Sequence, residues 1–161
     1  MDLLRRTAAH AADFLAGLDA RPVAPTAGVA ELRKALGHPL TDGGVDAGQV
    51  VDDLVRDTAD GLLATAGGRF YGWVIGGSVP AALAADWLVS AWDQNAAMHA
   101  CGPAVAVVEE VAGAWLKDLL RLPADASFGF TTGAQSAHVT ALAAARHHLL
   151  AERGWDVEVG S

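Results

Sequence analysis

The stretch "FTTGAQSAH", residues 130–138, is the part of the sequence on which the fold prediction depends. An apolar run, 128–130, leads into a turn at 131–133, and an alanine-rich helical pattern follows over 135–153. The first backbone N–H groups of a helix have no partner within it, and the helix dipole favours negative charge there. Such a strand–turn–helix junction predicts a site for a phosphate. On local grounds alone, a threonine-capped helix with nothing bound is the alternative.

The turn does not belong to the two best-known phosphate motifs. No Lys-Ser/Thr pair follows Gly133, as a Walker loop would require, and the G-x-G-x-x-G spacing of a dinucleotide fingerprint is absent. Thr131, Thr132 and Ser136 could add hydroxyl donors to the backbone groups. The residues alone therefore leave two interpretations open, an anion site of another kind and a capped helix with nothing bound.

Outward from this turn, the chain is dominated by helical patterns in which apolar residues recur every three or four positions. Asp46 is placed to cap one helix, Pro80 to begin another and Gly154 to end the last. Two segments, 67–80 and 128–131, predict short extended pieces. Two such pieces cannot close a sheet by themselves. The expected helices are 3–18, 28–37, 46–65, 81–97, 104–119 and 135–153.

Composition narrows the classes of partner. Of the 161 residues, 52% are hydrophobic and 19% are charged, with a mean hydropathy of +0.27 and a formal net charge of −8. The apolar excess predicts burial against a partner subunit or against further chain. The negative charge argues against nucleic acid and against an anionic membrane surface as partners. The longest uncharged apolar stretch, 70–85, is too short and too rich in glycine to predict a membrane span.

Single polar residues give weaker signals. One cysteine, Cys101, excludes an internal disulfide and fits a reducing cytoplasm, and the N-terminus lacks the apolar core of a secretory signal. His99 and Cys101 alone are too few ligands for a metal site. His138 could approach a ligand at the turn or serve only in packing. The remaining histidines and paired carboxylates are expected to be solvated or capping residues: His147, His148, Asp52, Asp53, Glu109 and Glu110.

Three stretches carry a resemblance to a known family. They are "RFYGWVIGGSVPAALAADWLVSAWDQN" (69–95), "GPAVAVVEEVAGAWLKDLLRLP" (102–123) and "FTTGAQSAHVTALAAARHHLLAERGWDV" (130–157), preceded by the connector "LDARPVAP" (18–25). In their order and spacing they resemble the N-terminal part of group II pyridoxal-phosphate-dependent decarboxylases. This family includes the aromatic amino-acid, glutamate, histidine and tyrosine decarboxylases.

The resemblance implies an α/β fold. The chain would be the N-terminal part of a PLP-dependent transferase architecture (aspartate-aminotransferase-like, fold type I), mostly helical within this chain. Residues 1–66 would be an N-terminal helical segment that forms the dimer. Residues 67–161 would be the start of the large PLP-binding α/β domain, truncated here.

The resemblance also implies positions for two functional groups of residues. The family's phosphate-binding turn matches Gly133, Ala134 and Gln135, whose backbone N–H groups would hold the phosphate of pyridoxal 5'-phosphate. The aromatic-glycine loop that borders the substrate pocket matches 73–78. Trp73, a large aromatic residue beside glycines, is the best pocket-lining candidate from the residues themselves. The candidate lining residues of this pocket are Trp73, Ile75 and Gly76.

The family's intertwined homodimers imply further contacts. Residues around Asn95, Ala97 and His99 would face the active site of the neighbouring subunit. The sequence departs from its relatives at "GGRF", 67–70, where they commonly carry a histidine-proline pair.

A larger departure concerns the chemistry. The family's ring-stacking histidine, its aspartate at the pyridine nitrogen and its Schiff-base lysine all lie downstream of the matched region. The two lysines present, Lys34 and Lys117, fall inside amphipathic helical patterns, where a desolvated Schiff-base amine is not expected. The expected function is therefore an inactive N-terminal fragment of an amino-acid decarboxylase, cytoplasmic, that forms a homodimer or is completed by a missing C-terminal portion. Its small-molecule substrate would be an acidic or aromatic amino acid. The alternatives are a non-catalytic helical interaction protein and one half of a split enzyme.

Overall fold

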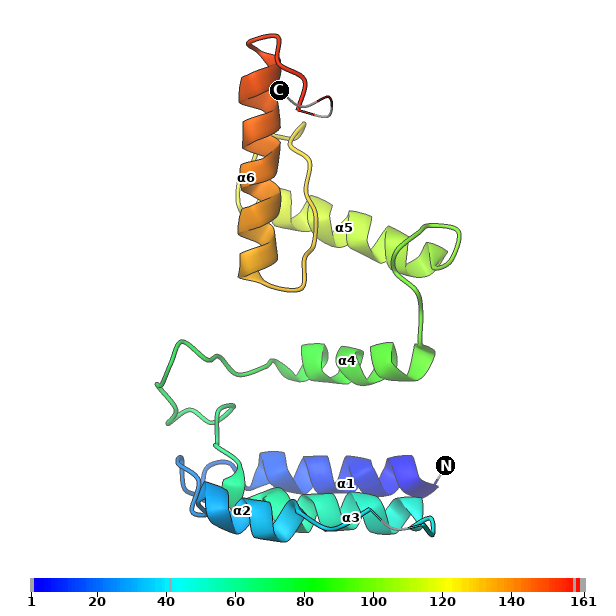
Figure 1. Ribbon diagram of the computed structural model, residues 1–161, viewed down its shortest axis with the longest axis vertical. Helices are drawn as coiled ribbons and strands as arrows, with labels where there is room; N and C mark the ends of the chain where they lie inside the picture. The colour runs from blue at the N-terminus through cyan, green and yellow to red at the C-terminus, as the bar shows by residue number, and fades with distance from the viewer. Residues whose placement is uncertain (1, 41, 158, 160–161) are drawn as a thin grey trace. The chain divides into compact units, whose positions relative to one another are not determined.

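The computed structural model describes residues 2–40, 42–157 and 159, and its regular elements are all helical (Figure 1). By contacts it divides into two compact units, Met1–Leu88 and Val89–Ser161. The predicted functional division after residue 66 stays a prediction. The elements are α1 (Asp2–Ala16), α2 (Val29–Leu36), α3 (Ala47–Thr58), the 3₁₀ turn η1 (Ala59–Gly61), α4 (Pro80–Trp92), α5 (Pro103–Leu119) and α6 (Ala134–Ala151).

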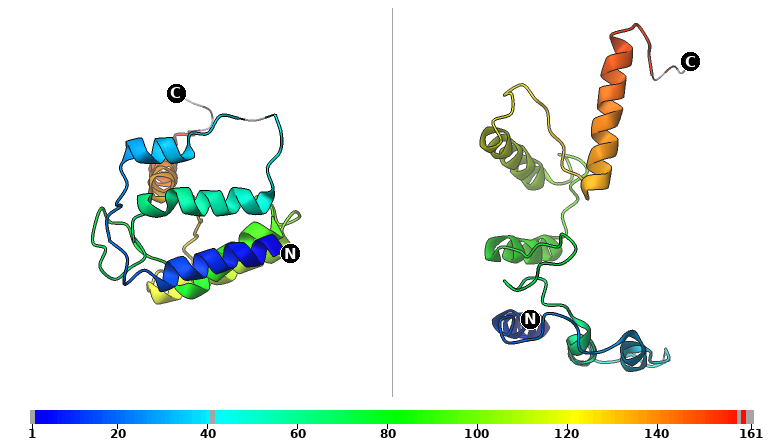
Figure 2. Two further views of the ribbon diagram at one scale, coloured as in Figure 1. Left: turned by 90° about the horizontal axis from the view of Figure 1, so that it is seen from below. Right: turned by 90° about the vertical axis from the view of Figure 1, so that its left-hand side faces the viewer.

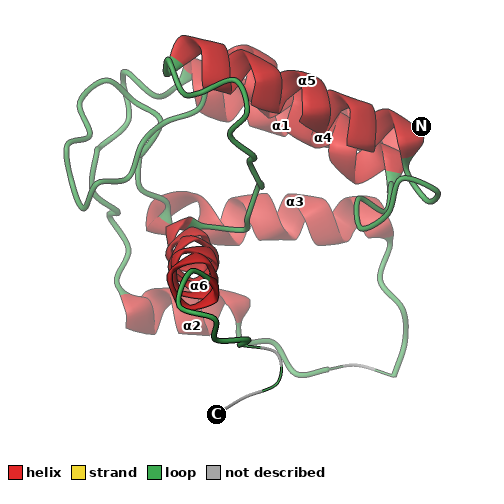
Figure 3. Cartoon of the chain, turned by 90° about the horizontal axis from the view of Figure 1, so that it is seen from above, coloured by secondary structure: helices red, strands yellow, loops and turns green. Residues whose placement is uncertain are grey.

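The prediction of an α/β fold is wrong for this structure. The described residues form helices and loops and contain no strand (Figure 3). The segment 67–80 was expected to begin extended and run into a loop, and it contains no strand before α4 begins at Pro80, while 128–131 before α6 is a loop. An extended segment becomes a strand only when a neighbouring strand pairs with its backbone, and neither segment has such a neighbour in the described chain.

The predicted helices are confirmed, although several of them end early. Asp46 caps α3 as expected, because its Oδ1 accepts a hydrogen bond of 3.1 Å from the Gln49 amide. Pro80 begins α4, which ends at Trp92 because Asp93 takes a left-handed conformation, with φ of 48°. Gly154 is left-handed too, with φ of 74°, but α6 ends three residues before it, at Ala151.

In the first unit, α3 packs against both α1 and α2, and Figure 2 shows α1 and α3 side by side. The connecting loops are joined by backbone hydrogen bonds. The amides of Thr26 and Ala27 donate to the Asp60 carbonyl at 2.8 and 2.9 Å, and the Ala64 amide donates to the Val23 carbonyl at 3.1 Å. Ala64 is the one buried hydrophobic residue of the described chain. These hydrogen bonds join the segment that follows α1 to the segment that follows α3.

Arg69, in the "GGRF" segment, gives the first unit a further connection. Its Nη2 donates to the carbonyls of Asp19, at 2.8 Å, and Arg21, at 2.7 Å. The guanidinium thereby joins the chain after η1 to the chain after α1. The "GGRF" segment is therefore anchored at its third residue.

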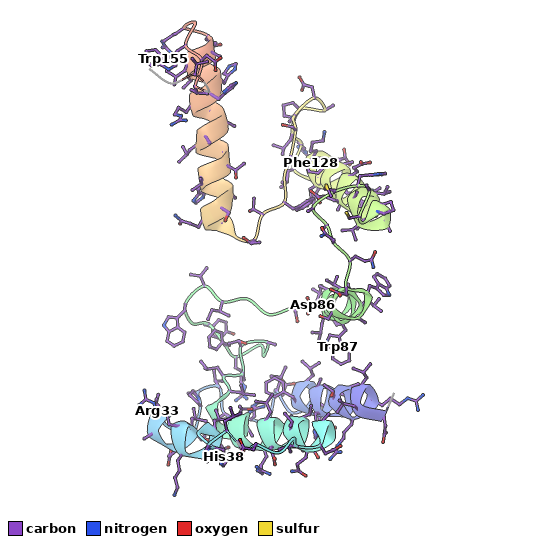
Figure 4. All side chains as sticks on the ribbon, turned by 45° about the vertical axis from the view of Figure 1, so that its right-hand side comes forward. Arg33, His38, Asp86, Trp87, Phe128 and Trp155 are labelled. Atoms are coloured by element: carbon purple, nitrogen blue, oxygen red, sulfur yellow. The ribbon has the colours of Figure 1, made fainter. Side chains whose placement is uncertain are left out.

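In the second unit, the segment that leads to α6 packs against part of α5. The chain reverses at Arg121, whose φ is 55°, and Phe128 then lies against the helix (Figure 4). Gly113 is buried at this contact, because a Cβ added there would overlap the Phe128 ring. Lys117 Nζ donates to the Ala124 carbonyl at 2.9 Å and the Ala126 carbonyl at 3.0 Å. The loop is thus fixed to α5 at two neighbouring helical turns.

Large apolar side chains remain exposed on α4, α5 and α6. α6 has no buried residue, and α4 none either. Trp92 on α4 is 60% exposed, Trp115 on α5 is 73% exposed and Leu142 on α6 is 71% exposed. None of the described helices has both the length and the apolar character that a membrane crossing requires. The exposed residues are too many to be explained by scattered surface hydrophobics, so they indicate faces that another surface covers.

Candidate functional site

The predicted anion turn lies at the N-terminus of α6, in the second unit. Gly133 is the residue before the helix, and no side chain caps the helix there. The amides of Ala134, Gln135 and Ser136 have no acceptor in the described part of the chain, since the first bond to the turn is donated by Ala137 to the Gly133 carbonyl, at 3.1 Å. Three N–H groups therefore point out of the helix end, free to bind an anion.

Gly133 leaves open space in front of these groups. Its φ of 165° and ψ of 170° describe extended backbone, which any residue can adopt, so the conformation itself does not require glycine. A Cβ added at Gly133 would meet no atom within 4 Å. Neither strain nor packing within this chain thus explains the glycine. Room for a ligand close to the backbone is a physical reason for it.

The remaining polar groups of the turn fit an anion as well. The Thr131 hydroxyl donates to the Gly133 carbonyl at 3.0 Å, which orders the turn. No acidic residue lies in the first turn of α6, so no like charge opposes a phosphate there. His138 is exposed one turn further along. The arrangement can bind a phosphate through backbone donors and the helix dipole.

The predicted substrate-pocket residues lie in the first unit, in the loop before α4. Trp73 is 79% exposed and Ile75 is 46% exposed, and a Cβ at Gly76 would meet open space. Trp73 and Val74 are both left-handed, with φ of 54° and 58°. That conformation is unfavourable for a β-branched residue. Since these residues and the α6 turn belong to different units, their joint site stays a prediction.

The residues expected to face a neighbouring subunit follow α4. Asn95 folds back on its own backbone, since its Oδ1 accepts a hydrogen bond of 2.9 Å from the Ala97 amide. Ala97 and His99 are exposed, as is Cys101. Their role at a subunit contact stays a prediction.

The described residues contain no cluster of three or more histidine, cysteine or acidic side chains that could hold an ion. On α6, His148 Nε2 lies 3.3 Å from Glu152 Oε1 in an exposed pair.

The two lysines lie where the sequence places them, on helices. Lys117 Nζ is held by two carbonyls and lies 5.9 Å from the centroid of the Phe128 ring. Lys34 is exposed on α2. Neither amine faces a pocket, so neither is placed to bond covalently with a cofactor.

A polar cluster between α1 and α3 was not anticipated from the sequence. Asp52 is ion-paired with Arg6 and accepts a hydrogen bond from His10 at 2.9 Å through its other oxygen. Arg6 and His10 are four residues apart, so they share one face of α1. That spacing was readable from the sequence, but their common acceptor is 42 residues beyond His10.

Further along α3, ion pairs within the helix shift two pKa values. Hydrogen bonds from Gln49 and then from Arg56 hold the pKa of Asp53 below its ordinary value. Hydrogen bonds to Asp57 and then to Asp53 raise the pKa of Arg56. Arg56 is exposed and the two carboxylates are half-buried, and the contacts among them stabilise the helix locally.

Two apolar pockets of the first unit also escaped the sequence interpretation. One, of about 530 Å³, is lined by alanines and Leu15 of α1 and by Leu83, Ala84 and Trp87 of α4. Trp87 is labelled in Figure 4. The other, of about 400 Å³, lies between α1 and α3. Both form where helices from distant parts of the sequence meet.

Comparison with known proteins adds no family to this geometry. The chain matches no protein-family model, and none of the curated proteins searched is significantly similar to it.

Proposed function

We propose that this chain contributes the cofactor-phosphate turn and a dimerisation surface to a cytoplasmic, PLP-dependent amino-acid decarboxylase. The observation that carries the proposal is the uncapped N-terminus of α6, with three unpartnered amides behind an open glycine. The sequence around it, "FTTGAQSAHVTALAAAR", resembles the same turn in group II decarboxylases. The proposal concerns helices and a turn and requires no sheet within this chain.

The residues present fit the phosphate end of the cofactor. The backbone N–H groups of Gly133, Ala134 and Gln135 would hold the phosphate, and the unpartnered amide and the hydroxyl of Ser136 would add two further donors. When bound, pyridoxal phosphate supplies an electron-withdrawing ring that stabilises the charge left as carbon dioxide departs from the amino acid. The turn would orient the cofactor, and the aromatic loop with Trp73, Ile75 and Gly76 would border the substrate.

The chain lacks a lysine placed for covalent catalysis. Lys117 Nζ is engaged with the Ala124 and Ala126 carbonyls, and Lys34 lies on an exposed helix. Turnover would therefore need a lysine from a C-terminal portion or from a second polypeptide. The chain alone is expected to bind the phosphate group without decarboxylating an amino acid.

One observation favours a second candidate function. The exposed apolar residues of α4 and α5, among them Trp92 and Trp115, form faces that a subunit contact would cover. A non-catalytic helical interaction protein would use these faces and would not need the α6 turn. Half of a split enzyme would need both.

Phosphate binding separates these candidates. The chain, labelled with ¹⁵N, is titrated with inorganic phosphate and with pyridoxal phosphate while the amide resonances of 133–136 are followed. We expect saturable shifts confined to these amides. Gly133→Glu should weaken binding by about tenfold or more, or ~1.4 kcal/mol, because its carboxylate competes for the same donors. The substitution should leave the helix content unchanged, since any residue adopts this backbone.

A matched control lies four residues earlier. Gly129 also has open space around it, so Gly129→Glu adds the same charge outside the turn and should leave phosphate affinity nearly unchanged. Absence of any shift in the wild-type chain, together with self-association, would support the interaction protein and refute the decarboxylase proposal. Equal weakening by both variants would show that charge, not the turn, governs binding.

A further inference from the structure

The chain between α5 and α6, residues 120–133, ends in the predicted anion turn and forms no helix or strand of its own. We call it the α5–α6 linker. It reverses direction at Arg121, whose φ is 55°, and the Leu122 amide closes the reversal by donating to the Lys117 carbonyl at 2.9 Å. Because α6 buries no residue, its own packing does not hold the turn in place. The contacts of the linker therefore decide how well the turn is ordered.

Lys117 provides the first attachment of the linker to α5. Its half-buried Nζ donates to the Ala124 carbonyl at 2.9 Å and to the Ala126 carbonyl at 3.0 Å. Hydrogen bonds from an ammonium group are stronger than those between neutral groups. The same nitrogen lies 5.9 Å from the centroid of the Phe128 ring. One side chain thus contacts three alternate positions of the linker.

Phe128 provides the second attachment and extends it toward the turn. Its ring fills the space in front of Gly113, where an added Cβ would overlap it. The Phe130 ring meets the Phe128 ring edge to face, with their centroids 5.8 Å apart. The next residue, Thr131, donates its hydroxyl to the Gly133 carbonyl at 3.0 Å. These contacts form a series that leads from α5 to the residue before α6.

The order of the turn matters for the affinity of an anion. A turn that becomes fixed only when the anion arrives loses conformational entropy at that moment, whereas a turn fixed beforehand does not. The unpartnered amides of 134–136 belong to the helix, but the approach to them is formed by 131–133, which end the linker. A linker attached to α5 should therefore support tighter anion binding than a detached one.

We propose that Lys117 is a positioning residue for the α6 turn. By holding 124–128 on α5, its ammonium group keeps the turn in the arrangement that binds an anion, and it need not contact the anion itself. This inference rests on the proposed function, because it concerns the same phosphate. Coupling between two sites is reciprocal, so phosphate bound at 133–136 should in turn strengthen the attachment of the linker to α5.

The test uses the full ¹⁵N-labelled chain and inorganic phosphate, with the affinity measured from the amide shifts of 133–136. Lys117→Met removes both hydrogen bonds to the linker and should weaken phosphate binding by roughly three- to tenfold. Lys117→Arg keeps a charged group that can donate to two carbonyls, so it should bind within about twofold of the wild-type chain. Lys34→Met is the matched control, because it removes the same charge from an exposed position in the first unit and should leave the affinity unchanged.

A second variant separates position from charge. Phe128→Ala detaches the linker from Gly113 without changing the net charge, so it should weaken phosphate binding about as much as Lys117→Met does. In the reciprocal measurement, saturating phosphate should slow hydrogen exchange of the Ala126 amide, which donates to the Pro123 carbonyl at 3.0 Å. This slowing should occur in the wild-type chain and be lost in Lys117→Met. Circular dichroism checks that each variant keeps its helices.

The outcomes distinguish this inference from the proposed function. If the wild-type chain binds phosphate at 133–136 and neither Lys117→Met nor Phe128→Ala weakens it, the positioning role is refuted and the proposed function stands. Equal weakening by Lys117→Met and Lys34→Met, with Phe128→Ala unchanged, would show that net charge acts and the linker does not. If the wild-type chain gives no shift at 133–136, the proposed function fails, and the positioning role fails with it.

Discussion

The helices α1 to α3 of the first unit and the helices α5 and α6 of the second are held together by different means. Between α1 and α3, Asp52 joins Arg6 and His10, and backbone bonds tie the connecting loops. In the second unit, the segment before α6 is attached to α5 through Phe128 and Lys117. α6 itself buries no residue. One region has polar connections between its helices, and in the other a single loop is attached to α5 through Phe128 and Lys117.

The difference follows from where each helix carries its apolar residues. α1 and α3 have an apolar stripe opposite a polar one, so two such helices can close on each other and leave charged residues to pair at the edge. α6 has exposed Val139, Leu142 and Leu149 among alanines, with no strongly polar face. A helix that is apolar on most sides is stable only when it is covered on most sides. The second unit therefore needs a partner surface more than the first does.

The largest expected effect comes from breaking the contact between Phe128 and α5 in the second unit. Gly113→Val places two methyl groups where the Phe128 ring lies, so the ring must leave α5. Overpacking of this kind costs about 1–3 kcal/mol. We expect hydrogen exchange of the α5 amides and of 124–128 to accelerate, while α1 and α3 keep their protection.

The control for this substitution is the next residue on the same helix. Ala114 is exposed, so Ala114→Val introduces the same β-branched side chain into α5 without touching the Phe128 ring. If Ala114→Val accelerates exchange as much as Gly113→Val, the contact with Phe128 does not hold the unit together.

A smaller effect is expected from the polar connection of the first unit. Asp52→Ala leaves Arg6 and His10 without their shared acceptor. Because all three side chains are partly exposed, the loss should be about 1 kcal/mol of the free energy of unfolding. Urea unfolding followed through protected α1 amides measures it. Asp53→Ala removes contacts within α3 alone, and a loss as large as that of Asp52→Ala would contradict a role for the bridge between helices.

The sequence predicted local structure well, since local structure depends on neighbours. Capping by Asp46 and the start of α4 at Pro80 each depend on a few adjacent residues. The extended segments at 67–80 and 128–131 failed as strands because a strand depends on a partner elsewhere in the chain. The early end of α4 depends on a left-handed Asp93, for which the sequence gives no strong signal.

The candidate sites divide in the same way. The unpartnered amides at the start of α6 could be predicted because they are consecutive in the sequence, whereas phosphate binding by Gly133, Ala134 and Gln135 stays a prediction. The pocket between α1 and α3 could not be predicted, because Asp13 and Arg21 meet Val55 only after two helices pack. The sequence alone could not explain Gly133. Its backbone angles can be adopted by any residue, and the structure shows open space around it.

The smallest expected effect concerns contacts within one helix, which contrast with the bridges between helices. Gln49 and Arg56 hydrogen-bond Asp53 and lower its pKa. Since the folded-state pKa lies below the unfolded value of about 3.9, the stabilisation is complete above that pH. It is lost as the pH falls through the folded-state pKa. Gln49→Ala should raise the pKa of Asp53 toward its ordinary value, as a ¹³C titration of the carboxyl group would show. Arg56→Met should raise it as well, because it removes both a hydrogen bond and a positive charge, and no rise with either variant would contradict these causes. A larger rise with Arg56→Met would mean that charge, not the amide donor, dominates at this position.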